Sequence, residues 1–137
     1  MGRILALDYG LKRTGIAVTD PSRIISTPLL TIHTSGLFEF LKSYFMKEQV
    51  EIIVVGMPRK LDNTPTDMTK PVEKLVDKLK KTFPDKKVTL QDERFTSSIA
   101  RAAILESGMK KKGRRKKENV DKISATLILQ SYMESQK

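Results

Sequence analysis

Apolar residues recur along the chain in two patterns, one typical of strands and one of helices. Five stretches have the pattern of β-strands. Short runs of aliphatic residues bounded by Gly, Pro or acidic residues are typical of strands. The longest such run, EIIVVGMP, indicates a strand that is buried on both faces. Pro28 in IISTPLLTIH favours an edge or bulged strand, because proline lacks the N–H that a central strand needs. The predicted strands span 4–8, 14–20, 24–33, 51–58 and 87–93.

Helical spacing of apolar residues appears in further stretches between and after these strands. In SGLFEFLKSYFMKEQ the apolar and aromatic positions return every three or four residues, which predicts an amphipathic helix whose aromatic rings belong to the core. The same spacing, with Gly or Pro as a stop signal in two cases, predicts three more helices. The predicted helices span 35–49, 71–83, 97–108 and 119–133.

The order of these elements predicts the fold class. The first three strands are joined by short links, so we expect them to pair antiparallel. The later strands are separated by helices, so we expect parallel pairing through right-handed crossovers. The prediction is an α/β protein with a mixed sheet and helices on its faces. With 137 residues and no internal repeat or linker, residues 1–137 are expected to form a single domain.

Net charge points to a polyanionic partner. The chain carries a formal net charge of +10 and a sequence pI of about 9.9, which favours nucleic acid before an acidic membrane surface. Much of this charge stands in one stretch, KKKGRRKK, called the basic run below; without its seven positive charges the net charge would be +3. We expect these side chains to grip a phosphate backbone, although such a run can also be a merely solvated segment. The basic run comprises Lys110, Lys111, Lys112, Arg114, Arg115, Lys116 and Lys117.

The composition also limits the chemistry. There is no cysteine and one histidine, His33, which excludes disulfides, thiolate nucleophiles and multi-histidine metal sites. His33 is expected at a strand end with no catalytic task. Any metal would be held by carboxylates, whose oxygens suit Mg²⁺, Mn²⁺ or Ca²⁺. No apolar stretch is long enough to span a bilayer and no signal peptide is recognisable, so a cytoplasmic location is expected.

Acidic residues stand where two predicted strands end. Asp8 closes the first strand, and Asp92 and Glu93 close the last one. Ligand sites in open α/β sheets lie beyond strand ends, so Asp8 and Glu93 could converge. Asp121, near the start of the last helix, shares a helical face with Ala125 that should look toward the sheet. Carboxylates brought together in this way would bind divalent cations that activate water against a phosphodiester.

These acids also have plainer interpretations. Asp8 could bond the following turn, Glu93 could pair with Arg94, and Asp121 could simply favour a helix start. Lys12 and Arg13 follow Asp8 directly, where they could bind phosphate or form a solvated hairpin tip.

Four stretches together carry a resemblance to a known family. They are RILALDYGLKRTGIAVTDP, VVGMP, DERFTSSIA and VDKISATLILQSYM, and with the intervening lengths they cover essentially the whole chain. The sequence resembles the YqgF/RuvX family of bacterial proteins, which have a ribonuclease H-like fold. One departure lies at 61–64, where LDNT stands in place of an expected Asp-Gly turn.

The resemblance implies a fold, a reaction and a set of site residues. The implied fold is a five-stranded mixed sheet with helices on both sides. The implied site holds Mg²⁺ or Mn²⁺ on Asp8, Glu93 and Asp121, with Asp92 as a weaker candidate. Arg94 follows Glu93, where it could orient that carboxylate or bind a backbone phosphate. Members are described as Holliday-junction resolvases and as nucleases that mature the 5′ end of 16S ribosomal RNA. The expected function is therefore metal-dependent phosphodiester hydrolysis in structured nucleic acid, with DNA or RNA left open.

Two other function classes remain open on the sequence. A non-catalytic RNA- or ribosome-binding module could use the same basic run, although this chain keeps all three acids. A phosphotransferase of the actin and sugar-kinase superfamily shares the Asp-x-Gly at the end of the first strand, but it needs two such domains. Oligomeric state, monomer or homodimer, also stays open, since symmetric cutting of a four-way junction would need two sites.

Overall fold

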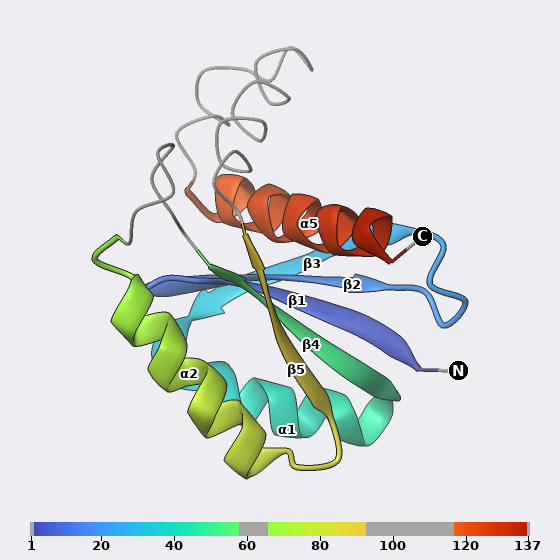
Figure 1. Ribbon diagram of the computed structural model, residues 1–137, viewed down its shortest axis with the longest axis horizontal. Helices are drawn as coiled ribbons and strands as arrows, with labels where there is room; N and C mark the ends of the chain where they lie inside the picture. The colour runs from blue at the N-terminus through green and yellow to red at the C-terminus, as the bar shows by residue number, and fades with distance from the viewer. Residues whose placement is uncertain (1, 58–65, 93–116, 137) are drawn as a thin grey trace, which may run out of the picture.

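The computed structural model describes residues 2–57, 66–92 and 117–136, with the side chains of the last helix from Ile123 onward. In this part of the chain, five strands form one sheet (Figure 1). The strands are β1 (Arg3–Tyr9), β2 (Arg13–Thr19), β3 (Ser26–His33), β4 (Val50–Met57) and β5 (Lys87–Asp92). The helical segments are η1 (Thr34–Gly36), α1 (Leu37–Lys47), α2 (Thr69–Thr82) and α5 (Lys117–Ser135).

The sheet is mixed, in the order β3-β2-β1-β4-β5. The pairs β1–β2 and β2–β3 are antiparallel, whereas β1–β4 and β4–β5 are parallel. This is the predicted arrangement of three antiparallel strands with parallel additions. It places β1 at the centre of the sheet, with one strand between β1 and β5.

The third strand shows why a proline fits there. β3 lies at the edge of the sheet, and its register with β2 shifts between the pairs Ile16–Leu30 and Ala17–Pro28. Pro28 therefore sits at both an edge and a bulge, as its missing N–H predicts. The strand begins at Ser26, later than the predicted start at residue 24, because Ile24 and Ile25 belong to the preceding loop, where they are exposed.

Helices cover both faces of the sheet (Figure 1). Alternate strand residues such as Leu5 and Leu7 pack with α1 and α2 in the larger core cluster. The other strand positions, including Ile4 and Ala6, pack against α5. The predicted core role of the aromatic residues of α1 is confirmed, since Phe38, Phe40, Tyr44 and Phe45 pack against the larger cluster.

The remaining boundaries differ from the prediction by small amounts. The helix predicted at 35–49 is divided into η1 and α1, and α5 begins two residues earlier than predicted. The helix predicted at 97–108 and the departure at 61–64 lie outside the described residues. Among the helices that are described, none has the length and apolar character to cross a membrane.

Candidate active site

The carboxyl ends of β1, β4 and β5 share one edge of the sheet, because these three strands run parallel. Asp8 is the next-to-last residue of β1 and is half-buried. Side chains alternate along a strand, so Asp8 points to the same face as Ile4 and Ala6, which pack with α5. The predicted carboxylate at a strand end is thus found on the central strand, on the face that α5 covers.

Glycines flank Asp8 on both neighbouring strands. On β2, Gly15 is the direct partner of Asp8. On β4, the last registered pair with β1 is Leu7–Val55, and Gly56 follows it. A residue opposite Asp8 would place its Cβ within about 5 Å of the aspartate Cβ. Neither glycine has a side chain, so no side chain from these two strand positions stands beside the carboxylate.

The next strand adds a residue that the sequence analysis did not select. Gln91 on β5 pairs with Gly56, so it lies on the same face as Asp8 with Gly56 between them. The Gln91 Nε2 donates a hydrogen bond to Ser131 Oγ on α5 at 2.9 Å, which holds the amide toward that helix. The alternation of KVTLQDE could have shown that Gln91 and Asp92 face opposite ways, but only the register places Gln91 in line with Asp8.

Asp92 does not share this face. It pairs with Met57, whose side chain belongs to the core cluster under α1 and α2, and it is exposed at the last position of β5. Asp92 is therefore less suited than Asp8 to a site on the α5 face.

Other predicted site residues lie partly or wholly outside the described residues. Glu93 follows β5 directly, and it lies outside the described residues together with Arg94 and with the basic run up to Lys116. Asp121 lies in the backbone of α5, but its side chain is outside the described part. Farther along α5, the residues at helical spacing from position 121 are buried against the sheet, which confirms the predicted inward face; they are Ala125, Ile128 and Tyr132.

The turn after β1 is tied to the end of β3 by hydrogen bonds. Thr34 Oγ1 donates to the Gly10 carbonyl oxygen at 2.5 Å, and its own backbone N–H donates to the Lys12 carbonyl oxygen at 3.1 Å. The buried Thr14 hydroxyl lies 2.9 Å from the same Thr34 oxygen. A Cβ at Gly10 would come within 2.5 Å of the Arg13 carbonyl oxygen, so this tight turn requires glycine.

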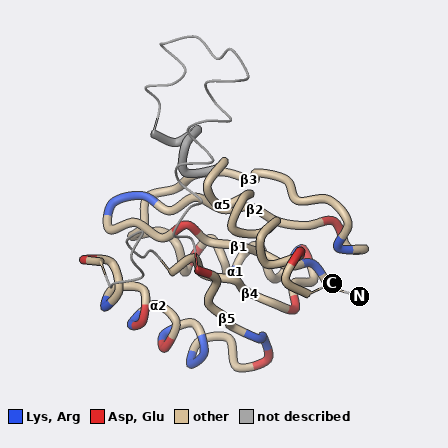
Figure 2. Tube along the Cα trace, turned by 45° about the horizontal axis from the view of Figure 1, so that its top comes forward, with Lys and Arg blue, Asp and Glu red and all other residues tan. Residues whose placement is uncertain are grey.

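This turn presents the two predicted phosphate-binding residues. Lys12 is exposed and Arg13 is half-buried at the start of β2. Basic positions mark the same turn in Figure 2. His33 lies exposed at the last position of β3, as predicted for a strand-end residue.

Metal ligation can be judged only on part of the predicted set. Among the described residues, no group of three His, Cys, Asp or Glu side chains is arranged to hold a metal. Of the predicted ligands, the structure describes the side chain of Asp8 alone. The hard oxygen donors of the predicted set suit Mg²⁺ or Mn²⁺.

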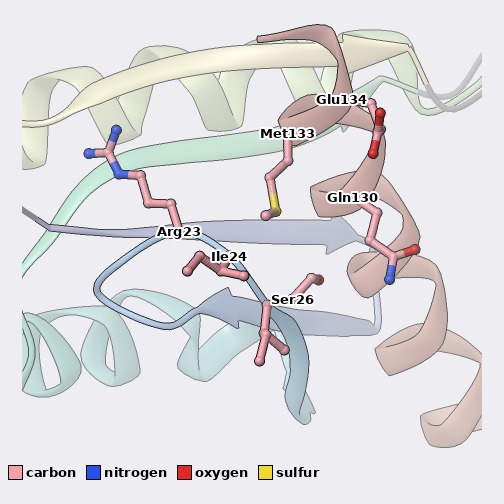
Figure 3. Close-up of a pocket in the computed structure, with 7 residues that line it drawn as sticks. Arg23, Ile24, Ser26, Gln130, Met133 and Glu134 are labelled. Atoms are coloured by element: carbon pink, nitrogen blue, oxygen red, sulfur yellow. The ribbon is translucent and has the colours of Figure 1, made fainter. Parts of the chain in front are cut away.

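A separate hollow of about 670 Å³ lies between the β2–β3 loop and the last turns of α5 (Figure 3). Arg23 lines it, and that guanidinium is held by the Gly2 carbonyl oxygen at 2.8 Å and by Glu51 at 2.5 Å. The described lining residues include one carboxylate, Glu134. This hollow therefore lacks the carboxylate cluster that phosphodiester chemistry would need.

The mixed five-stranded sheet, helices on both faces and an aspartate at the end of the central strand define a ribonuclease H-like α/β protein. The family model described as "RuvX: Holliday junction resolvase" matches residues 2–135, and the chain belongs to this family. The family is one of nucleases, so a role on nucleic acid follows at that level.

Relatives match over nearly their full length. A protein of Phocaeicola vulgatus is 50% identical over 137 residues, covering 100% of this chain and 99% of its own. A protein of Amoebophilus asiaticus is 47% identical, with coverages of 100% and 97%. Both carry the name "Putative pre-16S rRNA nuclease". Among solved structures, Pelota of Archaeoglobus fulgidus aligns over 98% of this chain and 37% of its own at 14% identity, and the TM-score of 0.46 is too low to bear on function.

Proposed function

We propose that residues 1–137 act as one metal-dependent nuclease domain that hydrolyses phosphodiester bonds in structured nucleic acid. The observation that carries the proposal is Asp8, half-buried on the central strand between two glycine positions. A carboxylate at a strand end is suited to a cation and a phosphate together. The nuclease family and the relatives' names support the reaction class.

The residues that would hold the metal are Asp8, Glu93 and Asp121. When bound, Mg²⁺ or Mn²⁺ lowers the pKa of a coordinated water and offsets negative charge on the phosphate. The donor chemistry is all carboxylate, as these hard cations prefer. Gln91, on the face of Asp8, is an added candidate for orienting a ligand there through its amide.

The chain's own basic residues would position the substrate. Lys12 and Arg13 would contact the phosphate backbone next to Asp8, with the turn held by Thr34. Arg94 and the basic run would extend this contact. We expect water as the nucleophile, because the chain has no cysteine and offers no obvious residue for covalent catalysis.

The names of the relatives and of the family indicate two candidate substrates. We propose the precursor of 16S ribosomal RNA at its 5′ end as the first candidate and a Holliday junction as the second. The first would involve ribosomal particles as partners and a cytoplasmic location. A monomer would suffice for trimming an RNA end, whereas paired cuts in a junction would favour a homodimer.

Cleavage assays test the proposal directly. A labelled four-way DNA junction and a precursor RNA covering the 16S 5′ region are offered to the protein with Mg²⁺, Mn²⁺ or EDTA, and to Asp8→Asn in parallel. Cutting of either polymer that disappears with EDTA and in Asp8→Asn would support the nuclease and identify its substrate. Salt-sensitive binding without any cutting would contradict it and favour the non-catalytic RNA-binding module.

A further inference from the structure

A second hollow adjoins the strand-end edge on the other face of the sheet. It has a volume of about 570 Å³ and lies between the end of β1, the η1–α1 segment and the first half of α2. Tyr9, the residue after Asp8, lines it together with Phe38. The hollow therefore begins one residue away from the candidate active site.

The rim of this hollow carries two lysines from α2. Lys74 and Lys78 are four residues apart on the helix, so they stand on the same side of it, and both are exposed. Lys78 Nζ lies 4.3 Å from the centre of the Phe38 ring, and this contact holds the ammonium at the rim of the hollow. Within the part of the chain that the structure describes, neither lysine forms an ion pair with a carboxylate. Both charges are thus available to an anionic ligand.

The floor of the hollow is apolar and partly aromatic. Tyr9 and Phe38 are half-buried: they pack against the core cluster and still line the hollow. Glu39 is the one acidic residue among the described lining, so the rim keeps a positive excess. A basic rim above aromatic rings is the combination that proteins use for single-stranded nucleic acid, where phosphates meet lysines and bases meet rings.

We propose that this hollow, between α1 and α2, binds a single-stranded segment of the nucleic-acid substrate as it leaves the strand-end site. Lys74 and Lys78 contact phosphates, and Tyr9 contacts bases. A duplex would not suit this floor, because its bases remain stacked on one another. The proposal rests on the proposed nuclease function for the identity of the ligand, and it adds a binding surface beyond the metal site.

Binding measurements in EDTA separate this surface from catalysis. The probe is a fluorescein-labelled single-stranded oligouridine, with a blunt RNA duplex as the second ligand. The test variant is Lys74→Gln/Lys78→Gln. The matched control is Lys80→Gln/Lys81→Gln, which removes the same charge from exposed positions of the same helix outside the described lining.

We expect the test variant to bind the single strand about tenfold more weakly than the control variant. Its plot of log affinity against log salt should flatten by about 1.4, as two lost phosphate contacts on a single strand predict. Tyr9→Leu should weaken single-strand binding without changing the salt slope, because the ring carries no charge. Blunt duplex should bind the two lysine variants equally.

The outcomes distinguish the two proposals. If the test and control variants bind the single strand with equal affinity and equal salt dependence, the proposed binding role of the hollow is wrong. Asp8-dependent cleavage in the same preparations would still support the nuclease. A selective loss in the test variant without any cleavage activity in the wild type would support the groove and contradict the nuclease. Absence of oligouridine binding by the wild type would overturn the groove.

Discussion

Where β1 and β4 begin, charged side chains are joined to one another and to the backbone. Arg23 bridges the Gly2 carbonyl oxygen and Glu51, and Arg3 joins Glu48 at 3.2 Å and the Thr19 carbonyl oxygen at 3.0 Å. Where the same strands end, the positions beside Asp8 on both neighbouring strands are glycine. One end of the sheet uses its charges to hold the chain together, whereas at the other a carboxylate stands between two glycine positions.

The titration of the carboxyl groups at the first end reflects this use. Three backbone N–H groups bond the Asp20 carboxylate, that of Ile25 most strongly at 2.7 Å, and they lower the pKa of Asp20 from its ordinary 3.8. The Gly2 N–H and then Arg23 lower the pKa of Glu51 from 4.5. The comparison teaches that charged residues hold the fold together at this end of the sheet, whereas Asp8 at the other end is the candidate for function.

The largest expected effect concerns nucleic-acid affinity. The basic run stands in the sequence between β5 and α5, and its last residue, Lys117, begins α5. Replacing its seven basic residues by glutamine should lower affinity for duplex nucleic acid by roughly 1,000-fold at moderate salt and flatten the salt dependence by about 6, if each contacts one phosphate. Asp8→Asn should bind as well as the wild type. Unchanged affinity of the neutralised variant, measured by anisotropy over a salt series, would remove the basic run from the binding surface.

A smaller effect is expected from adding a side chain at the glycine position beside Asp8. Gly56→Ala adds a methyl group between Asp8 and Gln91, and displacement of reacting groups by about 1 Å can slow catalysis roughly 100-fold. Gly36→Ala is the control, because a Cβ at Gly36 meets nothing within 4 Å. Cleavage rates and melting temperatures of both variants would be compared. If the Gly56→Ala variant cleaves as fast as the Gly36→Ala variant, cleavage does not require glycine at position 56.

The turn that carries Lys12 and Arg13 should be sensitive to its anchor. Thr34→Val removes the hydroxyl that bonds Gly10 and Thr14, which should lower the free energy of unfolding by about 1 kcal/mol. Cleavage should slow by roughly tenfold as the turn loosens. Thr27→Val, at an exposed position of β3, should change neither property. Urea unfolding and single-turnover cleavage provide the two readouts, and parallel results for both variants would contradict the anchoring role.

The smallest effect belongs to the first end of the sheet. Because folding lowers the pKa of Asp20, its carboxylate stabilises the fold above pH 3.8, and this contribution is lost as pH falls below that value. Asp20→Asn should therefore lower the melting temperature slightly at neutral pH, and the difference from wild type should shrink toward acid. Calorimetry between neutral and strongly acidic pH would check this, and a difference that grows on acidification would be the wrong sign.

Much of the fold could be predicted from local patterns. The apolar runs gave all five strands, and Pro28 gave the edge position of β3. The error at the start of β3 arose because Ile24 and Ile25 look like strand residues but stand 73% and 62% exposed in a loop. That loop depends on the left-handed backbone of Arg23, with φ of 59°, and on its long-range bonds to Gly2 and Glu51, which no local pattern contains.

Local patterns also predicted only part of the candidate site. Asp8 could be selected because a carboxylate at the end of an apolar run needs an explanation. The glycines beside it and Gln91 could not, because they come together only through the pairing register of three strands. The opposite orientation of Asp92 likewise follows from its pairing with Met57.

One measurement compares the two ends of the sheet most directly. Cleavage of the 16S precursor RNA in Mg²⁺ and the melting temperature are determined for wild type, Asp8→Asn and Asp20→Asn. We predict that Asp8→Asn cuts roughly 1,000-fold more slowly, since it would lose a proposed metal ligand. We predict that Asp20→Asn cuts at the wild-type rate with a lower melting temperature. An Asp8→Asn protein that cuts as fast as the wild type would contradict the assignment of Asp8 as the centre of the site.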